Sequence, residues 1–331
     1  MTQPDNDAEG ERLRVQRVRA ARSVPGLAED VLAGLSATPK TLHPKYFYDE
    51  RGSRLFDAIC DTPEYYPTRT EAALLEEHAA AIMALSDPLN MIELGSGASR
   101  KSRILLHAWP AANATYLPFD VSEEMLTSVA ADLVAEFPSL RVDALVGDYT
   151  AGLEHVPSPE GGTLWVFLGS TLGNFEPPEA EAFVAEIAAR LGPRDHFLLG
   201  VDLKKSEAVL EAAYNDAEGL TAAFNLNVLA VLNQRLDADF SLDRFEHLAY
   251  YCAGRSRIEM HLVSRQEQVV SVGGLNQSFT FAEGERMRTE ISRKFDLESV
   301  ESLFRATGLK AVQHFQHEEY PFLLTLASRD S

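Results

Sequence analysis

The chain has 331 residues, of which 50 are acidic and 30 basic, so its formal charge at neutral pH is −20. A surface with this charge repels phosphate backbones and anionic membranes, so we expect neither nucleic acid nor a membrane as a partner. The hydrophobic fraction of 45% is ordinary for a globular protein with a large core. The N-terminal residues carry no apolar signal segment, no apolar run could span a membrane, and there are only two cysteines. We therefore expect a cytoplasmic protein without disulfides.

The first 70 residues are irregular in pattern. We expect residues 1–19 to be disordered or weakly ordered, and two short helices to lie between residues 11 and 35. Two breaks rich in proline and tyrosine follow, at 38–48 and 61–70. Loops of this composition often form the walls of ligand pockets, because tyrosine combines a rigid ring with a polar tip. The alternative interpretation is that these tyrosines fill a joint between domains.

From residue 71 the pattern alternates between helices and apolar strands. Apolar strands separated by helices are typical of a parallel sheet that is covered on both faces. The predicted helices are 71–85, 101–109, 123–137 and 178–191, and the predicted strands are 89–94, 115–120, 140–146, 162–168 and 196–202.

After residue 205 the pattern changes. A long helical segment is followed by period-two alternation, which predicts an antiparallel meander, and the C-terminus would add a helix and two strands to the first sheet. We therefore predict an α/β fold: a doubly wound, mostly parallel Rossmann-like sheet with a second, smaller α+β domain. The predicted domains are 70–204 plus 288–331 and 20–69 plus 205–287. The elements predicted after residue 205 are the helices 206–233 and 296–307 and the strands 247–252, 257–264, 268–272, 277–281, 310–315 and 320–327.

A Gly-x-Gly turn lies between the first of these parallel strands and the next helix. Glu93 ends the strand, and Gly95 and Gly97 would let the backbone pass close to the amino-acid part of a nucleotide-like cofactor. A dinucleotide site would need a third glycine where Arg100 stands. The turn therefore favours S-adenosylmethionine over a dinucleotide, and its alternative is a purely structural turn.

Polar groups also end the following strands. Asp120 would accept hydrogen bonds from ribose hydroxyls, and Asp148 from an adenine amino group, with Tyr149 packed nearby. The loop 169–174 follows the fourth strand, where the partner that reacts with the cofactor would lie. Aspartate is common at strand ends and helix caps. However, ligands bind beyond the carboxyl ends of parallel strands, so groups on four successive strand ends predict a site for S-adenosylmethionine.

At this point the sequence resembles a known family, the histidine N-alpha-methyltransferases of ergothioneine biosynthesis. The resemblance runs from about residue 30 to the C-terminus and departs from the family pattern at Ala98, where a hydroxyl residue is expected. It implies an enzyme that transfers three methyl groups in turn from S-adenosylmethionine to the α-amino nitrogen of L-histidine, giving hercynine, without a metal. The motifs that carry it are TPKTLHPKYFYDERGSRLFD, PEYYPTRTEA, IELGSGASRKS, FLGSTLGN, AYNDAEGLTAAFNLNVL, RIEMHL and RTEISRKF.

The resemblance also implies a role for individual residues. Asn174 and Tyr214 would hold the substrate carboxylate, and Met260 would pack near the imidazole ring. Glu290 and Ser292 would hydrogen-bond that ring. Two catalytic tyrosines, Tyr48 and Tyr65, would line the amino-group side of the pocket, and Tyr65 would also bind substrate. The predicted cofactor-binding residues are Glu93, Gly95, Ser96, Gly97, Lys101, Asp120, Asp148 and Tyr149.

This chemistry depends on position more than on a special nucleophile. Methyl transfer from a sulfonium needs an amine lone pair aligned with the methyl group, so a hydroxyl such as that of Tyr48 could orient the amine or accept its proton. Glu290 with Ser292 would select the imidazole ring, because an unpaired buried carboxylate is costly. We expect a monomer without a metal site. The alternatives are a methyltransferase for another amino acid or imidazole compound, a nicotinamide oxidoreductase, and a non-catalytic cofactor-binding module.

Overall fold

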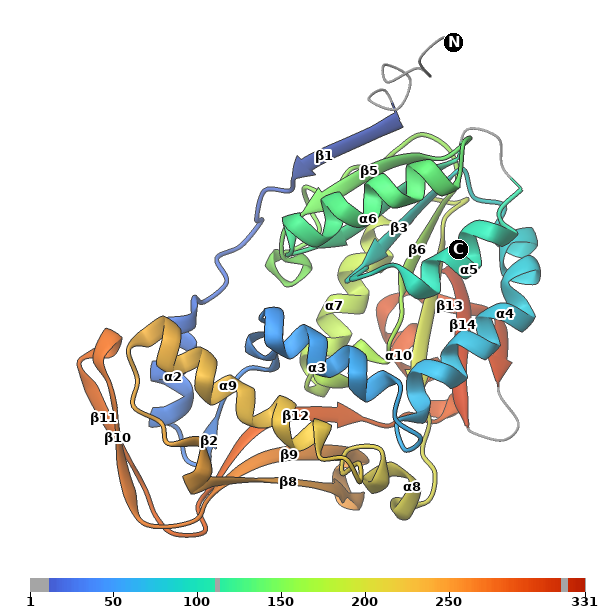
Figure 1. Ribbon diagram of the computed structural model, residues 1–331. Coiled ribbons are helices and arrows are strands. Elements are labelled where there is room, and N and C mark those ends of the chain that lie inside the picture. Colours follow the sequence, from blue (N-terminus) through green and yellow to red (C-terminus); the bar gives the residue numbers. More distant parts are fainter. Residues whose placement is uncertain (1–11, 111–113, 317–320, 331) are drawn as a thin grey trace.

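The computed structural model describes residues 12–110, 114–316 and 321–330. Their strands form an eight-stranded sheet, a four-stranded sheet and a two-stranded ribbon (Figure 1). The expectation of disorder for residues 1–11 lies outside the described residues. Within the described part of the chain, no helix is long and apolar enough to cross a membrane.

The eight-stranded sheet carries the glycine turn. Counted in spatial order, its first six strands pair in parallel. The seventh strand pairs antiparallel with the sixth, and the eighth pairs antiparallel with the seventh. The predicted fold class, an α/β protein with a mostly parallel central sheet, is therefore confirmed. In spatial order the strands are β1 (Leu13–Arg17), β5 (Arg141–Val146), β4 (Thr115–Asp120), β3 (Asn90–Leu94), β6 (Thr163–Phe167), β7 (His196–Asp202), β14 (Phe322–Arg329) and β13 (Leu309–Gln316).

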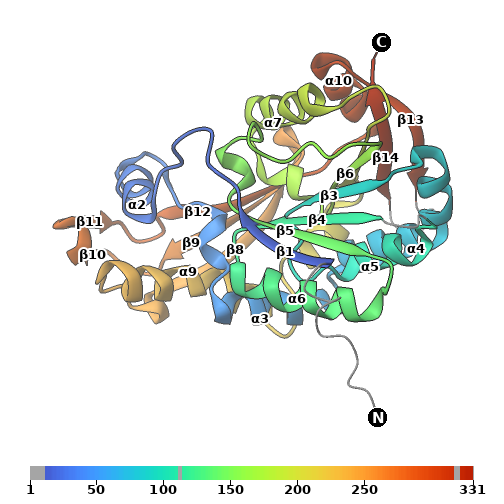
Figure 2. The same cartoon turned by 90° about the horizontal axis from the view of Figure 1, so that it is seen from above.

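Helices cover both faces of this sheet, as the view from above shows (Figure 2). Successive residues of a strand point to opposite faces. Met91 of β3 accordingly packs in a core with α4, α5 and α6, whereas Ile92 and Leu94 pack in a second core with α7 and α10. The helices are α4 (Tyr66–Ser86), α5 (Arg100–Ala108), α6 (Glu123–Glu136), α7 (Pro177–Arg190) and α10 (Leu297–Thr307).

The four-stranded sheet has a third core of its own. The helix α9 lies along this sheet and α3 packs on α9, so both helices stand between the two sheets (Figure 1). The strands in spatial order are β2 (Lys40–Thr41), β12 (Arg286–Arg293), β9 (Arg257–Ser264) and β8 (Phe245–Cys252). The remaining elements are α2 (Leu27–Ser36), α3 (Glu50–Cys60), α8 (Glu207–Ala212), α9 (Leu220–Leu236) and the ribbon β10 (Gln268–Val272) with β11 (Gln277–Phe281).

The N-terminal expectation is wrong for residues 13–17. They form β1 rather than a helix in a weakly ordered segment, and β1 extends the large sheet by pairing with β5. The guanidinium of Arg12 anchors this start by donating to the carbonyl of Val134 at 3.1 Å. A strand at the edge of a sheet is stabilised by its neighbour, so the short segment's own pattern does not reveal it.

The second half of the chain differs in three places. The expected helix 206–233 is divided into α8 and α9, and the expected meander is two hairpins that belong to different sheets. The strand β12 is absent from the sequence prediction. Because β12 pairs with β9 and β2, the predicted domain boundary at residue 288 falls inside a strand. We propose a boundary after residue 294 instead.

Candidate active site

The turn between β3 and α5 has the backbone of a ligand-binding loop. Gly95 and Gly97 both have positive φ, +73° and +49°. The amide of Gly97 donates to Oδ2 of Asp120 at 3.0 Å, which ties the turn to the end of β4. A Cβ atom added at Gly97 would meet nothing within 4 Å, so this glycine faces open space. A ligand can therefore approach the backbone here without a side chain in the way.

Tyr149 and Asp148 lie on the neighbouring strand end, beyond β5. The ring of Tyr149 covers the glycine turn, since a Cβ atom at Gly95 would lie 3.4 Å from its Cε1. Asp148 uses Oδ1 to accept from the amide of Thr150 at 2.8 Å. It also lines a hollow of about 250 Å³ whose other wall is the segment 18–24 that follows β1. This wall is absent from the sequence prediction, because it depends on the unexpected strand β1.

These residues fit a small polar cofactor such as S-adenosylmethionine. Besides the open glycine and the strand-end carboxylates, the buried hydroxyl of Ser96 has no hydrogen-bond partner among the described residues. A buried hydroxyl of this kind is costly unless a ligand satisfies it. The described residues include no group of three or more histidine, cysteine, aspartate or glutamate side chains that could hold a metal ion.

Two predicted cofactor residues instead have protein partners. Glu93 is buried and accepts hydrogen bonds from Ser102 and Tyr116, and burial raises the pKa of its carboxyl group to about 7. Lys101 forms an ion pair with Glu71 of α4. Direct contact of Glu93 or Lys101 with a cofactor therefore stays a prediction, and in this structure both residues hold the turn and α5 in place.

Glu71 is a site residue that sequence reasoning missed. Its side chain is fully buried, and both carboxylate oxygens accept from the amide of Gly169 at 2.9 Å. It thereby joins α4, α5 and the loop after β6 at one point. The signal was present: Glu71 shares the helix face of the apolar residues Leu74 and Leu75, so the helical period places it on the buried side.

The substrate side of the site is organised by a β-bulge in β12. Opposite β9, Arg288 pairs with His261 and Glu290 pairs with Met260, so Thr289 is an extra residue. Because neighbouring residues of β9 point to opposite faces, the bulge places Glu290 on the face opposite to Arg288. The hydroxyl of Thr289 anchors the bulge by donating to Oδ1 of the buried Asn225 at 2.7 Å.

Glu290 and Ser292 share one face of β12, two residues apart. Glu290 accepts no hydrogen bond from any described residue, and burial raises the pKa of its carboxyl group to about 7 although Lys294 opposes that shift. Ser292 Oγ accepts from the hydroxyl of Tyr214 at 2.8 Å and from Nζ of Lys294 at 2.9 Å. Glu290 is thus an unused acceptor, and Ser292 a hydroxyl whose oxygen is already occupied.

Lys294 belongs to a buried charge cluster at the end of β7, which we call the Asp202 cluster. Lys294 and Asp202 are both buried, and their Nζ and Oδ2 atoms lie 2.9 Å apart. Tyr66 donates to the same Oδ2 at 2.6 Å, and Lys205 forms an ion pair with Asp202. Burial alone would lower the pKa of Lys294, but Asp202 outweighs it and raises that pKa. For Lys205 burial dominates and lowers the pKa to about 8.

The two predicted catalytic tyrosines lie in an aromatic wall. Tyr48 packs edge-on against Phe56 of α3 and Phe224 of α9, with ring centroids 5.6 and 5.5 Å apart. Tyr65 packs edge-on against Phe56 and Tyr214 in the same way, at 6.1 and 6.2 Å. Phe56 is absent from the sequence prediction because no helix was predicted at α3, whereas Phe224 lies in the predicted helix 206–233 and had no predicted role.

Tyr48 lies at the edge of the site, and almost half of the residue is exposed. Desolvation of its hydroxyl, and then the nearby carboxylate of Glu290, raise its pKa well above the ordinary value. Desolvation likewise raises the pKa of Tyr65. Both tyrosines are therefore neutral phenols at physiological pH.

The last two predicted residues lie on either side of β12. The half-buried Asn174 ends a short turn, Thr171–Asn174, that is pressed against this strand. A Cβ atom at Gly173 would lie only 2.8 Å from the carbonyl oxygen of Arg293. The side chain of Asn174 has no hydrogen bond to any described residue. Met260 is buried directly opposite Glu290. The structure thus places Asn174 and Met260 next to β12, the strand that carries Glu290 and Ser292.

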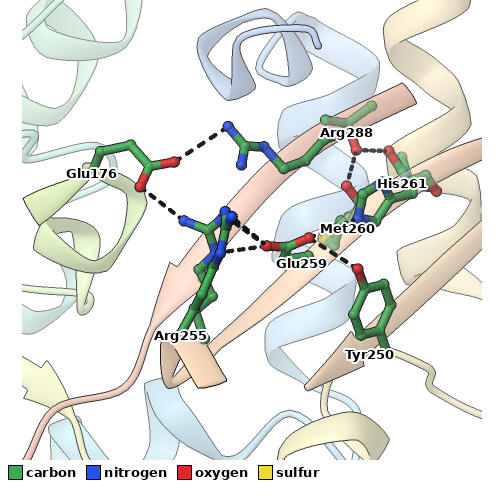
Figure 3. Close-up of polar contacts among 10 residues, drawn as sticks. Glu176, Tyr250, Arg255, Glu259, Met260, His261 and Arg288 are labelled. Carbon is green, nitrogen blue, oxygen red and sulfur yellow. Dashed lines mark hydrogen bonds and ion pairs between the residues drawn. The ribbon is translucent and has the colours of Figure 1, made fainter. Parts of the chain in front are cut away.

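The other face of β9 and β12 carries a second charge cluster, which we call the Glu176 cluster (Figure 3). Glu176, two residues after Asn174, pairs with the buried Arg257 at 2.8 Å and with Arg288 at 3.3 Å. Arg257 also pairs with Glu259 at 2.6 Å. Burial alone would raise the pKa of Glu259, but its hydrogen bonds, first of all that from Arg257, lower it to about 2.

Comparison with known proteins identifies the family of this chain. The family described as histidine-specific, S-adenosylmethionine-dependent methyltransferases matches residues 27–329. The histidine N-alpha-methyltransferase of Mycolicibacterium smegmatis is 46% identical over 312 residues, which is 94% of this chain and 97% of that protein. The enzyme of the same name from Mycobacterium tuberculosis is 42% identical over 305 residues, 92% of this chain and 95% of that protein.

A more distant relative has a different name. A 4-dimethylallyltryptophan N-methyltransferase of Penicillium roqueforti is 27% identical over 322 residues, 92% of this chain and 94% of that protein. The predicted enzyme class and cofactor are confirmed by the family match and by the two closer relatives. Because that match spans most of the sequence, this chain belongs to the family of histidine-specific, S-adenosylmethionine-dependent methyltransferases.

Proposed function

We propose that this protein methylates the α-amino nitrogen of L-histidine three times in succession and releases hercynine, as the first step of ergothioneine biosynthesis. The observation that carries the proposal is the pair of groups on β12. A neutral imidazole ring has one N–H donor and one nitrogen acceptor. Glu290 offers an unused acceptor, and Ser292 has a hydroxyl whose oxygen already accepts two hydrogen bonds. The Ser292 proton is thus available for the ring nitrogen, while Glu290 takes the ring N–H.

The aromatic wall supports methylation at nitrogen. The α-amino group of an amino acid is a cation at neutral pH, so it must lose its proton before the nitrogen can attack. The neutral hydroxyls of Tyr48 and Tyr65 would orient the nitrogen lone pair by hydrogen bonding. The tyrosine and phenylalanine rings would attract the positive charge that remains on a fully methylated nitrogen.

The two ends of the pocket have different tasks. S-adenosylmethionine supplies the methyl group when it is bound beside Gly97, Ser96 and Tyr149. Asn174 would hold the substrate carboxylate, so that the amino group faces the glycine turn. In the structure Tyr214 donates its proton to Ser292, so a role for Tyr214 in binding the carboxylate requires that hydroxyl to turn.

The proposal is tested by mass spectrometry of L-histidine incubated with the protein and S-adenosylmethionine. We expect a product with three added methyl groups and the consumption of about three cofactor molecules per histidine. A single added methyl group would limit the activity to one transfer. No mass gain with histidine would refute the substrate.

A second candidate is N-methylation of a different aromatic amino acid, which the relative from Penicillium roqueforti brings into consideration. An indole ring has an N–H donor but no ring acceptor, so it would leave the Ser292 proton without a partner. L-Tryptophan in the same assay distinguishes the two, because we expect methylation of histidine to be much the faster.

A further inference from the structure

The Asp202 cluster contains the buried cation Lys294, whose contacts extend to the proposed substrate-binding residue Ser292. An ammonium group has three N–H donors and no acceptor. All three donors of Lys294 have partners: Asp202 at 2.9 Å, Ser292 at 2.9 Å and the hydroxyl of Tyr214 at 3.1 Å. The side chain of Lys294 is buried, so its ammonium group cannot exchange these partners for water.

This arrangement leaves the proton of Ser292 without a partner in the cluster. Since Lys294 can only donate, the oxygens of Ser292 and Tyr214 accept from it. In the structure the hydroxyl of Tyr214 donates in turn to Ser292 Oγ, 2.8 Å away. Ser292 Oγ has both lone pairs occupied, so its own proton is left for a group outside the cluster. Asp202 is the counterion that keeps Lys294 charged and therefore keeps this arrangement.

We propose that Lys294, held by Asp202, is a positioning residue that makes Ser292 a dedicated hydrogen-bond donor and so selects substrates whose ring presents an acceptor nitrogen. This inference rests on the proposed function and deepens it. Glu290 would accept a hydrogen bond from the ring N–H, and Ser292, held by Lys294, would donate one to the other ring nitrogen. Selectivity for the ring would thus have two halves that act separately.

Two histidine analogues separate these halves. Pyrrolylalanine keeps a ring N–H but lacks an acceptor nitrogen, whereas thiazolylalanine has the acceptor but lacks the N–H. We would measure kcat/KM for L-histidine and for the positional isomers of both analogues. The key variant combines Lys294→Met with Asp202→Asn, so that the buried pair is removed together and Lys205 remains as the single cation of the cluster. The matched control is Glu290→Gln, and binding of S-adenosylhomocysteine by calorimetry reports an intact fold.

In the double variant we expect the preference for histidine over pyrrolylalanine to fall by about tenfold, the size of one hydrogen bond. The preference of the double variant for histidine over thiazolylalanine should stay unchanged. In Glu290→Gln we expect the preference over thiazolylalanine to fall and the preference over pyrrolylalanine to stay unchanged. If both preferences fall equally, or neither falls, Lys294 is structural and the proposal is wrong. If the double variant does not fold, Tyr214→Phe keeps both charges but removes one donor to Ser292, and must still weaken the same preference alone. Wild-type protein that does not methylate histidine would refute the proposed function itself, before any variant is compared.

Discussion

On the cofactor side of the candidate site, the carboxylates of Asp120 and Asp148 are held by backbone amides, whereas on the substrate side the hydroxyl of Ser292 is held by a buried charged side chain. Asp120 accepts from the amides of Gly97 and Ser122. Ser292, in contrast, depends on Lys294, which depends on Asp202. Substitution of neighbouring side chains should therefore disturb the cofactor side little. On the substrate side, a single substitution of a charged residue should disturb the other residues that depend on it.

The largest effect should come from breaking the Asp202 cluster. Asp202→Asn leaves the buried ammonium group of Lys294 without a counterion, so we expect a loss of about 3–5 kcal/mol in the free energy of unfolding. Chemical denaturation measures it. Adding Lys294→Met should restore part of this loss, and an additive further loss in the double variant would contradict the pairing.

Glu290→Gln should affect the substrate side alone. It removes a charged acceptor, which is worth about 1.5–3 kcal/mol. We therefore expect kcat/KM for histidine to fall by about ten- to a hundredfold. Calorimetry with S-adenosylhomocysteine should give an unchanged Kd. An equal loss in cofactor affinity would mean that Glu290 stabilises the structure as a whole.

The pH dependence of substrate binding should follow Glu290. Its pKa is about 7, and its carboxylate accepts the ring N–H more strongly than the neutral acid does. Lowering the pH through 7 protonates the acceptor, so the KM for histidine should rise as the medium becomes acidic. Histidine itself also titrates in this range, so Glu290→Gln is the reference. It keeps the titration of the substrate, and it should show a shallower rise than the wild type.

On the cofactor side, Gly97→Ala should cost less. A side chain in the left-handed region is strained by about 1–2 kcal/mol, and the new methyl group would enter the open space beside the turn. We expect up to a tenfold weaker binding of S-adenosylhomocysteine. Gly308→Ala is the matched control, because Gly308 has a similar positive φ and also faces open space at the end of α10. That control should leave cofactor binding unchanged.

The smallest effect should come from the Glu176 cluster. The side chain of Glu176 is 37% exposed, so its ion pairs are partly screened by water. We expect Glu176→Gln to raise the KM for histidine about two- to fivefold, by loosening the turn that carries Asn174. An unchanged KM would show that Asn174 is held by its packing against β12 alone.

The same difference explains what the sequence could reveal. The parallel strands and the glycine turn are local patterns, so the large sheet and the residues at its strand ends could be predicted. The aromatic wall and the Asp202 cluster join residues that are far apart in the chain, such as Tyr66 and Asp202. No local pattern indicates such a contact. The motif RTEISRKF contains Glu290 and Ser292, for which the resemblance implies a role, but Lys294 in the same motif has the pattern of an ordinary surface lysine and its burial is visible only in the structure.

The extra residue in β12 has a consequence for how the pocket could diversify. If the strand paired with β9 in regular alternation and kept all its residues, Thr289 would lie opposite Met260 and Glu290 would lie opposite Glu259. Glu290 would then share a face with Arg288 and Arg257, where guanidinium groups would neutralise it. A change in the pairing of β12 with β9 could therefore erase recognition of the ring while every recognition residue remained in the sequence. Substrate choice in this protein thus depends partly on the register of two strands, and a search for new specificities should vary the bulge at Thr289 as well as the side chains around it.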